Sequence, residues 1–208
     1  MSAPERATQV TTIPVLLGKR IKLRGFVLGD ARNVQLLAGD ERIAATTLNI
    51  PHPYPDGAAE GWIGTHETEF SSGEGVTWAV TLRDTGALIG AIGLSINREH
   101  NRATMGYWIA VPYWNQGYGT EAARLVLQYG FEVRRLRRID AEHFAGNPAS
   151  GRLMRKIGMT HEGTLRQHLV KWGRVDDAEY YGILREEFER NSGSGSSGSD
   201  RSEDRSRD

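Results

Sequence analysis

Cysteine is absent from the 208-residue chain, and this absence removes several kinds of chemistry. A disulfide scaffold, a cysteine-ligated zinc site and a thiol nucleophile are all excluded. No long hydrophobic run is present either, since the most apolar stretch, 87–96, has about half the length of a membrane-spanning helix. The first residues contain no apolar segment of signal-peptide length. We therefore expect a cytoplasmic protein with no membrane partner.

An excess of charge of either sign is also missing. Lys+Arg is 26 and Asp+Glu is 26, so the chain lacks the basic field that many nucleic-acid binders use. The strongest basic signal is the arginine cluster at 134–138, which we interpret as a solvated helix end that complements the helix dipole. The six histidines show no metal-ligand spacing. We expect neither a nucleic-acid partner nor a metal site.

Composition divides the chain into three parts. Residues 1–12 are polar, which predicts a flexible N-terminus. Residues 191–208 contain only polar, charged and glycine residues, and such a segment cannot bury enough apolar surface to offset its ordering entropy. A disordered tail is predicted there. Residues 13–190 are long enough to form one domain with a substantial core.

Within this domain the hydrophobic periodicity alternates between strand-like and helix-like spacing. Strands are expected at 21–27, 76–82, 87–96, 103–111, 138–144, 159–169 and 175–184. Helices are expected from Asp30, from an N-cap at Asp56, over 119–133 and from Pro148. The first helix is expected to turn Val34, Leu36 and Leu37 inward. This order predicts an α/β (α+β) domain, with a mixed sheet and helices on both faces.

A loop with two glycines connects the strand at 103–111 to the next helix. Gly117 and Gly119 let the backbone approach a ligand, and the free amides of the first helical turn favour a phosphate or pyrophosphate. A tight strand-to-helix turn explains the same glycines, so the pattern alone leaves both interpretations open. No lysine precedes Thr120 as a Walker loop requires, and Ala122 replaces the third glycine of a dinucleotide fingerprint.

Several segments from about Leu16 to Phe188 occur together in a characteristic order. They are Arg24-Gly25-Phe26, the proline-rich 50–54, and the segments 88–93, 106–109, 113–122, 147–159 and 181–187. In this order they resemble the GNAT-superfamily N-acyltransferases, in the branch of the ribosomal-protein N-terminal acetyltransferases RimJ and RimL. The resemblance implies a mixed, mostly antiparallel twisted sheet of about seven strands, splayed in the middle and covered by helices on both faces. It also implies acetyl-CoA as the acetyl donor.

The resemblance further implies where acetyl-CoA binds. The pantetheine arm would lie in the splay and pair with the backbone of Ile109, Ala110 and Val111. The pyrophosphate would be held by the loop residues Gln116, Gly117, Tyr118, Gly119 and Thr120. Asn147 resembles the asparagine that hydrogen-bonds the pantetheine arm, and it also suits the N-cap of the helix from Pro148. The first position of the family loop, usually Gln or Arg, is Trp114 here.

Two catalytic positions depart from the family pattern. Met154 occupies the position where many members carry the tyrosine that serves the departing thiolate, and Ser150 matches the serine of the ribosomal branch. Ser150 is therefore the predicted catalytic residue. Thr104 stands where relatives can carry a carboxylate base, and threonine cannot take that role at neutral pH. His52 and Tyr54, in the proline-rich loop, are the candidate substrate-binding residues.

Taken together, these features predict an acetyl-CoA-dependent N-acetyltransferase that acts directly on a primary amine. An α-amine has a pKa near 8 and a lysine near 10.4, so a weak base suffices only for the α-amine. This favours a protein N-terminus of the ribosomal-protein type as the acceptor. A small-amine acetyltransferase, acting on a polyamine, aminoglycoside or other drug, stays open as an alternative. A non-catalytic acyl-CoA-binding regulatory module is a second alternative. The sequence is compatible with a monomer or a homodimer.

Overall fold

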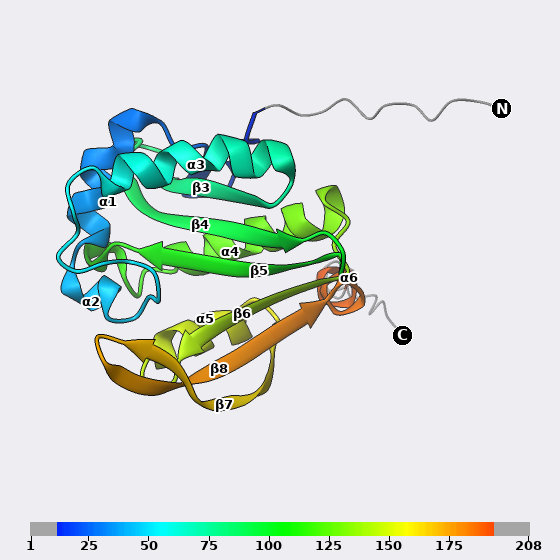
Figure 1. Cartoon of the computed structure of the whole chain (residues 1–208). Helices are drawn as coiled ribbons and strands as arrows, with labels where there is room; N and C mark the ends of the chain where they lie inside the picture. The colour runs from blue at the N-terminus through cyan, green and yellow to red at the C-terminus, as the bar shows by residue number, and fades with distance from the viewer. Residues whose placement is uncertain (1–11, 194–208) are drawn as a thin grey trace, which may run out of the picture.

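A single sheet runs through the molecule with helices on both faces (Figure 1). Its strands are Leu16–Leu17 (β1), Ile21–Arg24 (β2), Gly75–Leu82 (β3), Leu88–Asn97 (β4), Arg102–Ile109 (β5), Arg138–Phe144 (β6), Thr160–Lys171 (β7) and Arg174–Leu184 (β8). The spatial order is β1-β2-β3-β4-β5-β6-β8-β7. The computed structural model describes residues 12–193. Residues 1–11 and 194–208, which belong to the expected flexible N-terminus and disordered tail, lie outside this range.

The expected α/β class and the mostly antiparallel sheet are confirmed. Only β5 and β6 pair in parallel among the described strands, and every other neighbouring pair is antiparallel. The sheet has eight strands rather than about seven. The additional one is β1, whose two residues are too few to show an alternating pattern in the sequence.

The helices form two layers. They are Ala31–Ala38 (α1), Glu41–Ala44 (α2), Ala58–Ser72 (α3), Tyr118–Gln128 (α4), Pro148–Lys156 (α5) and Arg185–Gly193 (α6). On one face, α1 and α3 pack with the sheet residues Ala79, Ala91 and Trp108. On the other face, α4 and α5 pack with a larger cluster that includes Trp78, Ile92 and Met105. No helix in the range 12–193 is long and apolar enough to cross a membrane.

Two expectations about the first helices are wrong. Leu36 was expected to face inward, but 74% of it is exposed, because α1 buries the narrow stripe Ala31, Val34 and Ala38 instead. Asp56 was expected to cap α3, but Gly57 is the N-cap, with a left-handed φ of 78° that glycine adopts without strain. The Asp56 carboxylate accepts a hydrogen bond from Gln35 Nε2 at 2.7 Å, which holds the turn against α1.

Two boundaries also differ from the expected ones. The helix expected over 119–133 is α-helical to Gln128 and then continues as a π-helical turn, Tyr129–Val133. The last helix, α6, reaches Gly193 and so extends three residues into the segment expected as tail from 191. Phe188 anchors this helix, since its ring lies 5.0 Å from that of Phe131 between centroids. The contact packs the first half of α6 against the core.

An ion pair at the start of α1 ties this helix to β2. Arg24 donates to both carboxylate oxygens of Asp30, at 2.7 and 2.8 Å, and the Val27 amide donates to the same carboxylate at 3.0 Å. Burial pushes the pKa of Asp30 upward, but the bonds from Arg24 and Val27 outweigh it and lower the pKa below its ordinary value. The charged form of Asp30 is therefore stabilised by the fold.

We expect Asp30→Asn to lower the free energy of unfolding by about 1–3 kcal/mol at neutral pH, because Arg24 loses its charged partner in a largely buried site. A lowered folded-state pKa stabilises the fold above the ordinary aspartate pKa, and this stabilisation disappears as the pH falls through the folded-state value. The difference between the variant and the wild type should therefore shrink below about pH 4. Urea unfolding at several pH values measures it. Arg42→Ala, which breaks an exposed ion pair with Asp40, is the control and should change stability little. A difference that does not vary with pH would contradict the assignment.

Candidate functional site

The sheet opens between β5 and β6. Their parallel register joins Arg102 with Arg138, Ala103 with Ile139, and Thr104 with Asp140. Beyond these pairs β5 runs on to Ile109 and β6 to Phe144, with no further register pair between them in the described chain. The two strands diverge in Figure 1, as the expected splay requires. Backbone groups on the facing edges of both strands are thereby left for a ligand.

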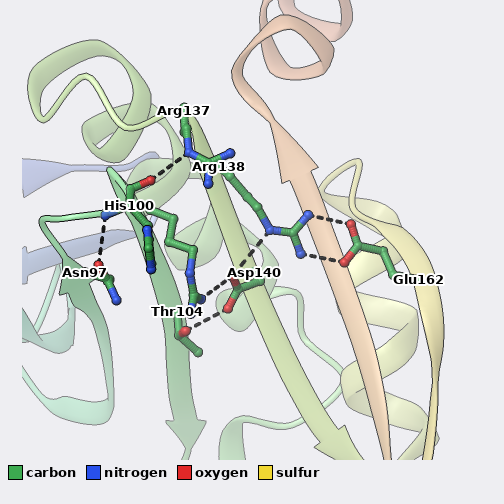
Figure 2. A network of polar contacts seen from close by, with 8 residues as sticks. Asn97, His100, Thr104, Arg137, Arg138, Asp140 and Glu162 are labelled. Atoms are coloured by element: carbon green, nitrogen blue, oxygen red, sulfur yellow. Dashed lines mark hydrogen bonds and ion pairs between the residues drawn. The ribbon is translucent and has the colours of Figure 1, made fainter.

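A buried carboxylate holds the closed end of this gap (Figure 2). Asp140 Oδ1 accepts a hydrogen bond from Thr104 Oγ1 at 2.7 Å, and Oδ2 accepts from Arg102 Nη1 at 3.0 Å and Arg138 Nε at 3.4 Å. Arg138 also pairs with Glu162 on β7. Asp140 is only 6% exposed. Three donors thus occupy this carboxylate, and Thr104, the position considered for a base, serves as one of them.

Two backbone amides point into the gap above this cross-link. The Ala110 amide donates to Ile89 O on β4 at 2.8 Å, so the amides of the adjacent Ile109 and Val111 point the other way, toward β6. Ala110 O is also engaged, since it accepts from the Tyr113 amide at 2.9 Å. Ile109 O accepts from the indole Nε1 of Trp114 at 2.5 Å. Ile109 and Val111 therefore offer amides to a ligand, whereas both polar backbone groups of Ala110 are used within the chain.

The loop before α4 has the geometry of an anion site. Gly117 is the N-cap of α4 and has a left-handed φ of 83°, and no side chain caps the helix there. The amides of Tyr118, Gly119 and Thr120 in the first turn have no partner within the helix, and the helix dipole adds positive potential. A Cβ on Gly117 would meet only Arg20 Nη2, at 3.3 Å. The space in front of these amides is therefore bordered by a cation.

Arg20 fastens this loop from a distant part of the sequence. Its Nη1 donates to Gln116 O at 2.9 Å, and its backbone amide and Nε donate to the Glu121 carboxylate at 2.7 and 3.0 Å. The guanidinium also lies 4.6 Å from the centroid of the Tyr118 ring. Burial pushes the pKa of Glu121 upward, but the bonds from Arg20 outweigh it and lower that pKa. Sequence reasoning missed Arg20, because nothing local links residues 101 positions apart.

Gly119 has a different physical role from Gly117. A Cβ on Gly119 would lie 2.9 Å from Leu153 Cδ1 and 3.4 Å from Ile109 Cγ1, so a side chain there would push α4 away from α5 and β5. Each of the two interpretations, ligand approach and tight packing, thus applies to one of the two glycines. Gly117 supplies the turn and the open approach, and Gly119 supplies close helix packing.

Two hydroxyl groups meet on the α4–α5 side of the gap. Tyr107 Oη on β5 lies 2.6 Å from Ser150 Oγ on the first turn of α5. Burial raises the pKa of Tyr107 to about 12, against the opposing effect of the Ser150 hydrogen bond, so the phenol keeps its proton. Asn147 caps α5 and accepts from the Ser150 amide at 3.4 Å, while Met154 is buried in the core. Sequence reasoning missed the role of Tyr107, because the sequence placed it only within a strand.

The proline-rich loop lies on the other face of the sheet, the face that α1 and α3 cover. His52 is exposed, its Nδ1 lies 2.9 Å from Gly39 O, and its ring lies 6.0 Å from the Trp172 ring. Tyr54 packs against the apolar cluster of α1 and α3. Lys171 Nζ, at the tip of the β7–β8 hairpin, donates to the carbonyls of residues 48 and 50 at 3.0 and 2.6 Å. The hairpin thus holds this loop in place, on the side away from Ser150.

Comparison with known proteins accounts for this combination of a splayed sheet and an amide-lined loop. A family model described as an acetyltransferase (GNAT) domain matches residues 20–160, from β2 to the start of β7. The chain belongs to the GNAT acetyltransferase family. It is 37% identical over 173 residues to the uncharacterized N-acetyltransferase YoaA of Bacillus subtilis, covering 83% of this chain and 97% of YoaA.

Solved structures of acetyltransferases have the same fold as this GNAT enzyme. A GNAT-family acetyltransferase from Bacillus anthracis superposes with a TM-score of 0.74 at 25% identity, covering 83% of this chain and 99% of that one. RimJ from Mycobacterium smegmatis, solved with CoA-disulfide, has the same fold, with a TM-score of 0.76 at 20% identity over 88% of this chain and 95% of RimJ. The protein is therefore an N-acetyltransferase, and acetyl-CoA is its acetyl donor.

The residues of the GNAT enzyme fit this donor. A pyrophosphate needs hydrogen-bond donors and positive charge, and the first turn of α4 together with Arg20 offers both. A pantetheine arm needs strand-like partners, and the gap-facing amides of Ile109 and Val111 are placed to act as such.

We expect Gly117→Val to weaken acetyl-CoA affinity at least about tenfold, because a branched side chain would fill the space in front of the α4 amides. Isothermal titration calorimetry measures the affinity, and circular dichroism checks the fold. Gly86→Val is a matched control: Gly86 has a similar left-handed φ of 72° and a Cβ there would meet no atom within 4 Å, but it lies in the β3–β4 turn. Equal losses of affinity in the two variants would remove the loop from the site.

Proposed function

We propose that this GNAT enzyme acetylates the α-amino group at the N-terminus of a cytoplasmic protein, in the manner of the ribosomal-protein acetyltransferases that its sequence resembles. The main support is the open sheet surface beside the gap, on the face of the proline-rich loop. Gly106 on β5 is exposed there, and a Cβ on it would meet no atom within 4 Å. β7 is exposed along most of its length. An extended chain end can reach such a surface, whereas small-molecule sites are usually enclosed.

The chemistry of the amine also favours this acceptor. A protein α-amine has a pKa near 8, so a useful fraction is neutral at physiological pH, whereas a lysine with a pKa near 10.4 is almost wholly protonated. Thr104, the position where relatives can place a carboxylate, donates its hydroxyl to Asp140 and cannot take a proton. An acceptor that loses its proton readily suits this site better than one that does not.

Each group around the gap then has a task. When bound, acetyl-CoA supplies the acetyl group as a reactive thioester. The α4 amides and Arg20 hold the pyrophosphate, and Asn147 and Val111 hold the pantetheine arm. The Ile109 amide polarises the acetyl carbonyl as an oxyanion donor. Ser150, hydrogen-bonded to Tyr107, donates to the sulfur as it departs.

Thiol release from acetyl-CoA against a panel of amines tests the proposal. The panel contains lysine-free peptides with free N-termini, N-terminally blocked peptides that carry one lysine, spermidine and an aminoglycoside. We expect turnover of the peptides with free N-termini and little of the others. Turnover of spermidine or the aminoglycoside alone would assign a small-amine acetyltransferase instead. Acetyl-CoA binding without turnover of any amine would indicate an acyl-CoA-binding module.

Ser150→Ala should lower kcat by about tenfold to a hundredfold with the best acceptor of the panel, the lower end of the range for a positioned proton donor. Acetyl-CoA affinity should stay within a few-fold, because the backbone amide that Asn147 caps is retained. Tyr107→Phe should reproduce part of the loss, since it removes the partner of Ser150. Ser71→Ala on α3, whose hydroxyl bonds only its own helix, is the control. An unchanged kcat in Ser150→Ala would mean that Ser150 does not serve the departing thiolate and that water does.

A further inference from the structure

A pocket of about 320 Å³ lies between α5 and the part of the sheet formed by β6, β7 and β8. Small-molecule sites have volumes in this range. Helix α5 contributes Pro148, Gly151 and Arg155, which are three and four positions apart and so form one stripe of the helix. Ser150 and Leu153 lie on another side of α5, toward β5 and α4. The rest of the lining is His143, Ala145, His161, Glu179 and Tyr181. Helix α5 thus separates this α5 pocket from the loop that fits acetyl-CoA.

His143 lines the α5 pocket with one ring nitrogen unused. The residue is only 7% exposed, and its Nδ1 lies 2.7 Å from Phe144 O. A carbonyl oxygen only accepts, so Nδ1 carries a proton and Nε2 of the neutral ring is an acceptor. Nε2 is buried and has no hydrogen-bond partner among residues 12–193. An N–H group of a ligand would remove the cost of this unpaired acceptor.

Gly151 leaves two polar atoms of the pocket uncovered. A Cβ at this position would lie 2.7 Å from His143 Nε2 and 3.1 Å from Tyr181 Oη. The two rings also stack, with 5.6 Å between their centroids. A side chain on α5 at this point would therefore cover both atoms, and glycine keeps them open to the pocket.

Arg155 brings a positive charge that no carboxylate of the described chain neutralises. Its Nη1 donates to Tyr181 Oη at 2.6 Å, and this is its one hydrogen bond within residues 12–193. Tyr181 Oη accepts that bond and still has its own proton to donate. A guanidinium binds a carboxylate through parallel N–H groups. Arg155 and the adjacent hydroxyl therefore suit the carboxylate of a ligand.

Glu179 brings a negative charge to the same pocket. Its Oε2 accepts from Thr164 Oγ1 at 2.9 Å and lies 2.5 Å from His161 Nε2, whereas its Oε1 has no partner in the described chain. The hydrogen bonds from Thr164 and His161 outweigh the effect of burial and lower the pKa of Glu179, so the carboxylate is charged at neutral pH. Glu179 pairs with His143 in the β6–β8 register, which puts both side chains on one face. Two acceptors for an ammonium group are thus adjacent.

We propose that the α5 pocket binds a free α-amino acid. The carboxylate of the amino acid pairs with Arg155 and accepts from the Tyr181 hydroxyl. Its ammonium group donates to Glu179 Oε1 and His143 Nε2. The proposal does not depend on which amine the enzyme acetylates.

The separation of the two charges favours a zwitterion over other ligands. Arg155 and Glu179 both line the pocket, yet they form no ion pair with each other. A simple anion would leave Glu179 without a cation, and a simple cation would leave Arg155 without an anion. A metal ion is not favoured, because residues 12–193 contain no group of three side chains that could hold one. A small molecule with both charges satisfies both groups.

Calorimetric titration of the full-length enzyme with L-alanine and L-leucine tests the proposal. The amide of the better binder lacks the carboxylate, and its N-acetyl derivative lacks the ammonium group. We expect the free amino acid to bind and each derivative to bind at least about tenfold more weakly, because each loses a charge-assisted hydrogen bond. Acetyl-CoA affinity should be the same with and without the amino acid, since α5 separates the two sites.

Three variants locate the binding in the α5 pocket. Arg155→Gln and Glu179→Gln should each weaken amino-acid binding about tenfold, because each removes one charged partner. His143→Phe keeps a ring against Tyr181 and removes Nε2, so it should weaken binding as well. Arg152→Gln is the matched control, because Arg152 is exposed on the same helix and does not line the pocket. Circular dichroism checks the fold of each variant.

Four results would overturn the proposal. The first is no binding of either amino acid at concentrations up to about 10 mM, which corresponds to negligible affinity. The second is equal binding of the amide or the N-acetyl derivative, and the third is an equal loss of affinity in Arg152→Gln. Displacement by acetyl-CoA, or acetylation of the amino acid at a rate that Arg155→Gln does not change, is the fourth, since either would place the amino acid in the gap.

Discussion

Where β5 and β6 part, the Asp140 carboxylate accepts hydrogen bonds from Thr104 on the neighbouring strand and from Arg102 and Arg138. A buried charge of this kind is tolerated only when its partners are in place, and losing one of them typically costs several kcal/mol. The last parallel pair is therefore held shut, and the ladder ends immediately beyond it. The open length of the gap, and every group that faces it, depends on where this cross-link lies.

The gap separates two chemical environments. Toward α4 and α5 it is bordered by the amides of the α4 first turn and by the hydroxyls of Tyr107 and Ser150, a set of donors suited to phosphate and to a departing sulfur. Toward α1 and α3 it is bordered by Gly106, which is exposed and carries no side chain. A splayed sheet provides this separation because adjacent residues of each strand point to opposite faces.

Two loops around the gap are held in position by residues from distant parts of the sequence. Arg20 connects the β1–β2 turn to Gln116 and Glu121, and Lys171 connects the β7–β8 hairpin to the loop that contains His52. Trp114 occupies the position of the family's usual Gln or Arg, and its indole closes the loop onto Ile109 O instead. The departure at this position thus has a structural use, since it orders the end of β5 next to the amides that face the gap.

Local patterns in the sequence were sufficient for the strands β2 to β8, the helices around Val34 and Leu153, the glycine loop and the Asn147 cap, because periodicity, capping and turn chemistry act over a few residues. They misplaced Leu36 and Asp56, where the width of a buried stripe and a left-handed glycine decided the outcome. Arg20 and Tyr107 could not be found in this way. Tyr107 meets a residue 43 positions away and Arg20 one 101 positions away. Such contacts depend on strand order, register and the point where β5 and β6 separate, and these are set by packing across the whole sheet.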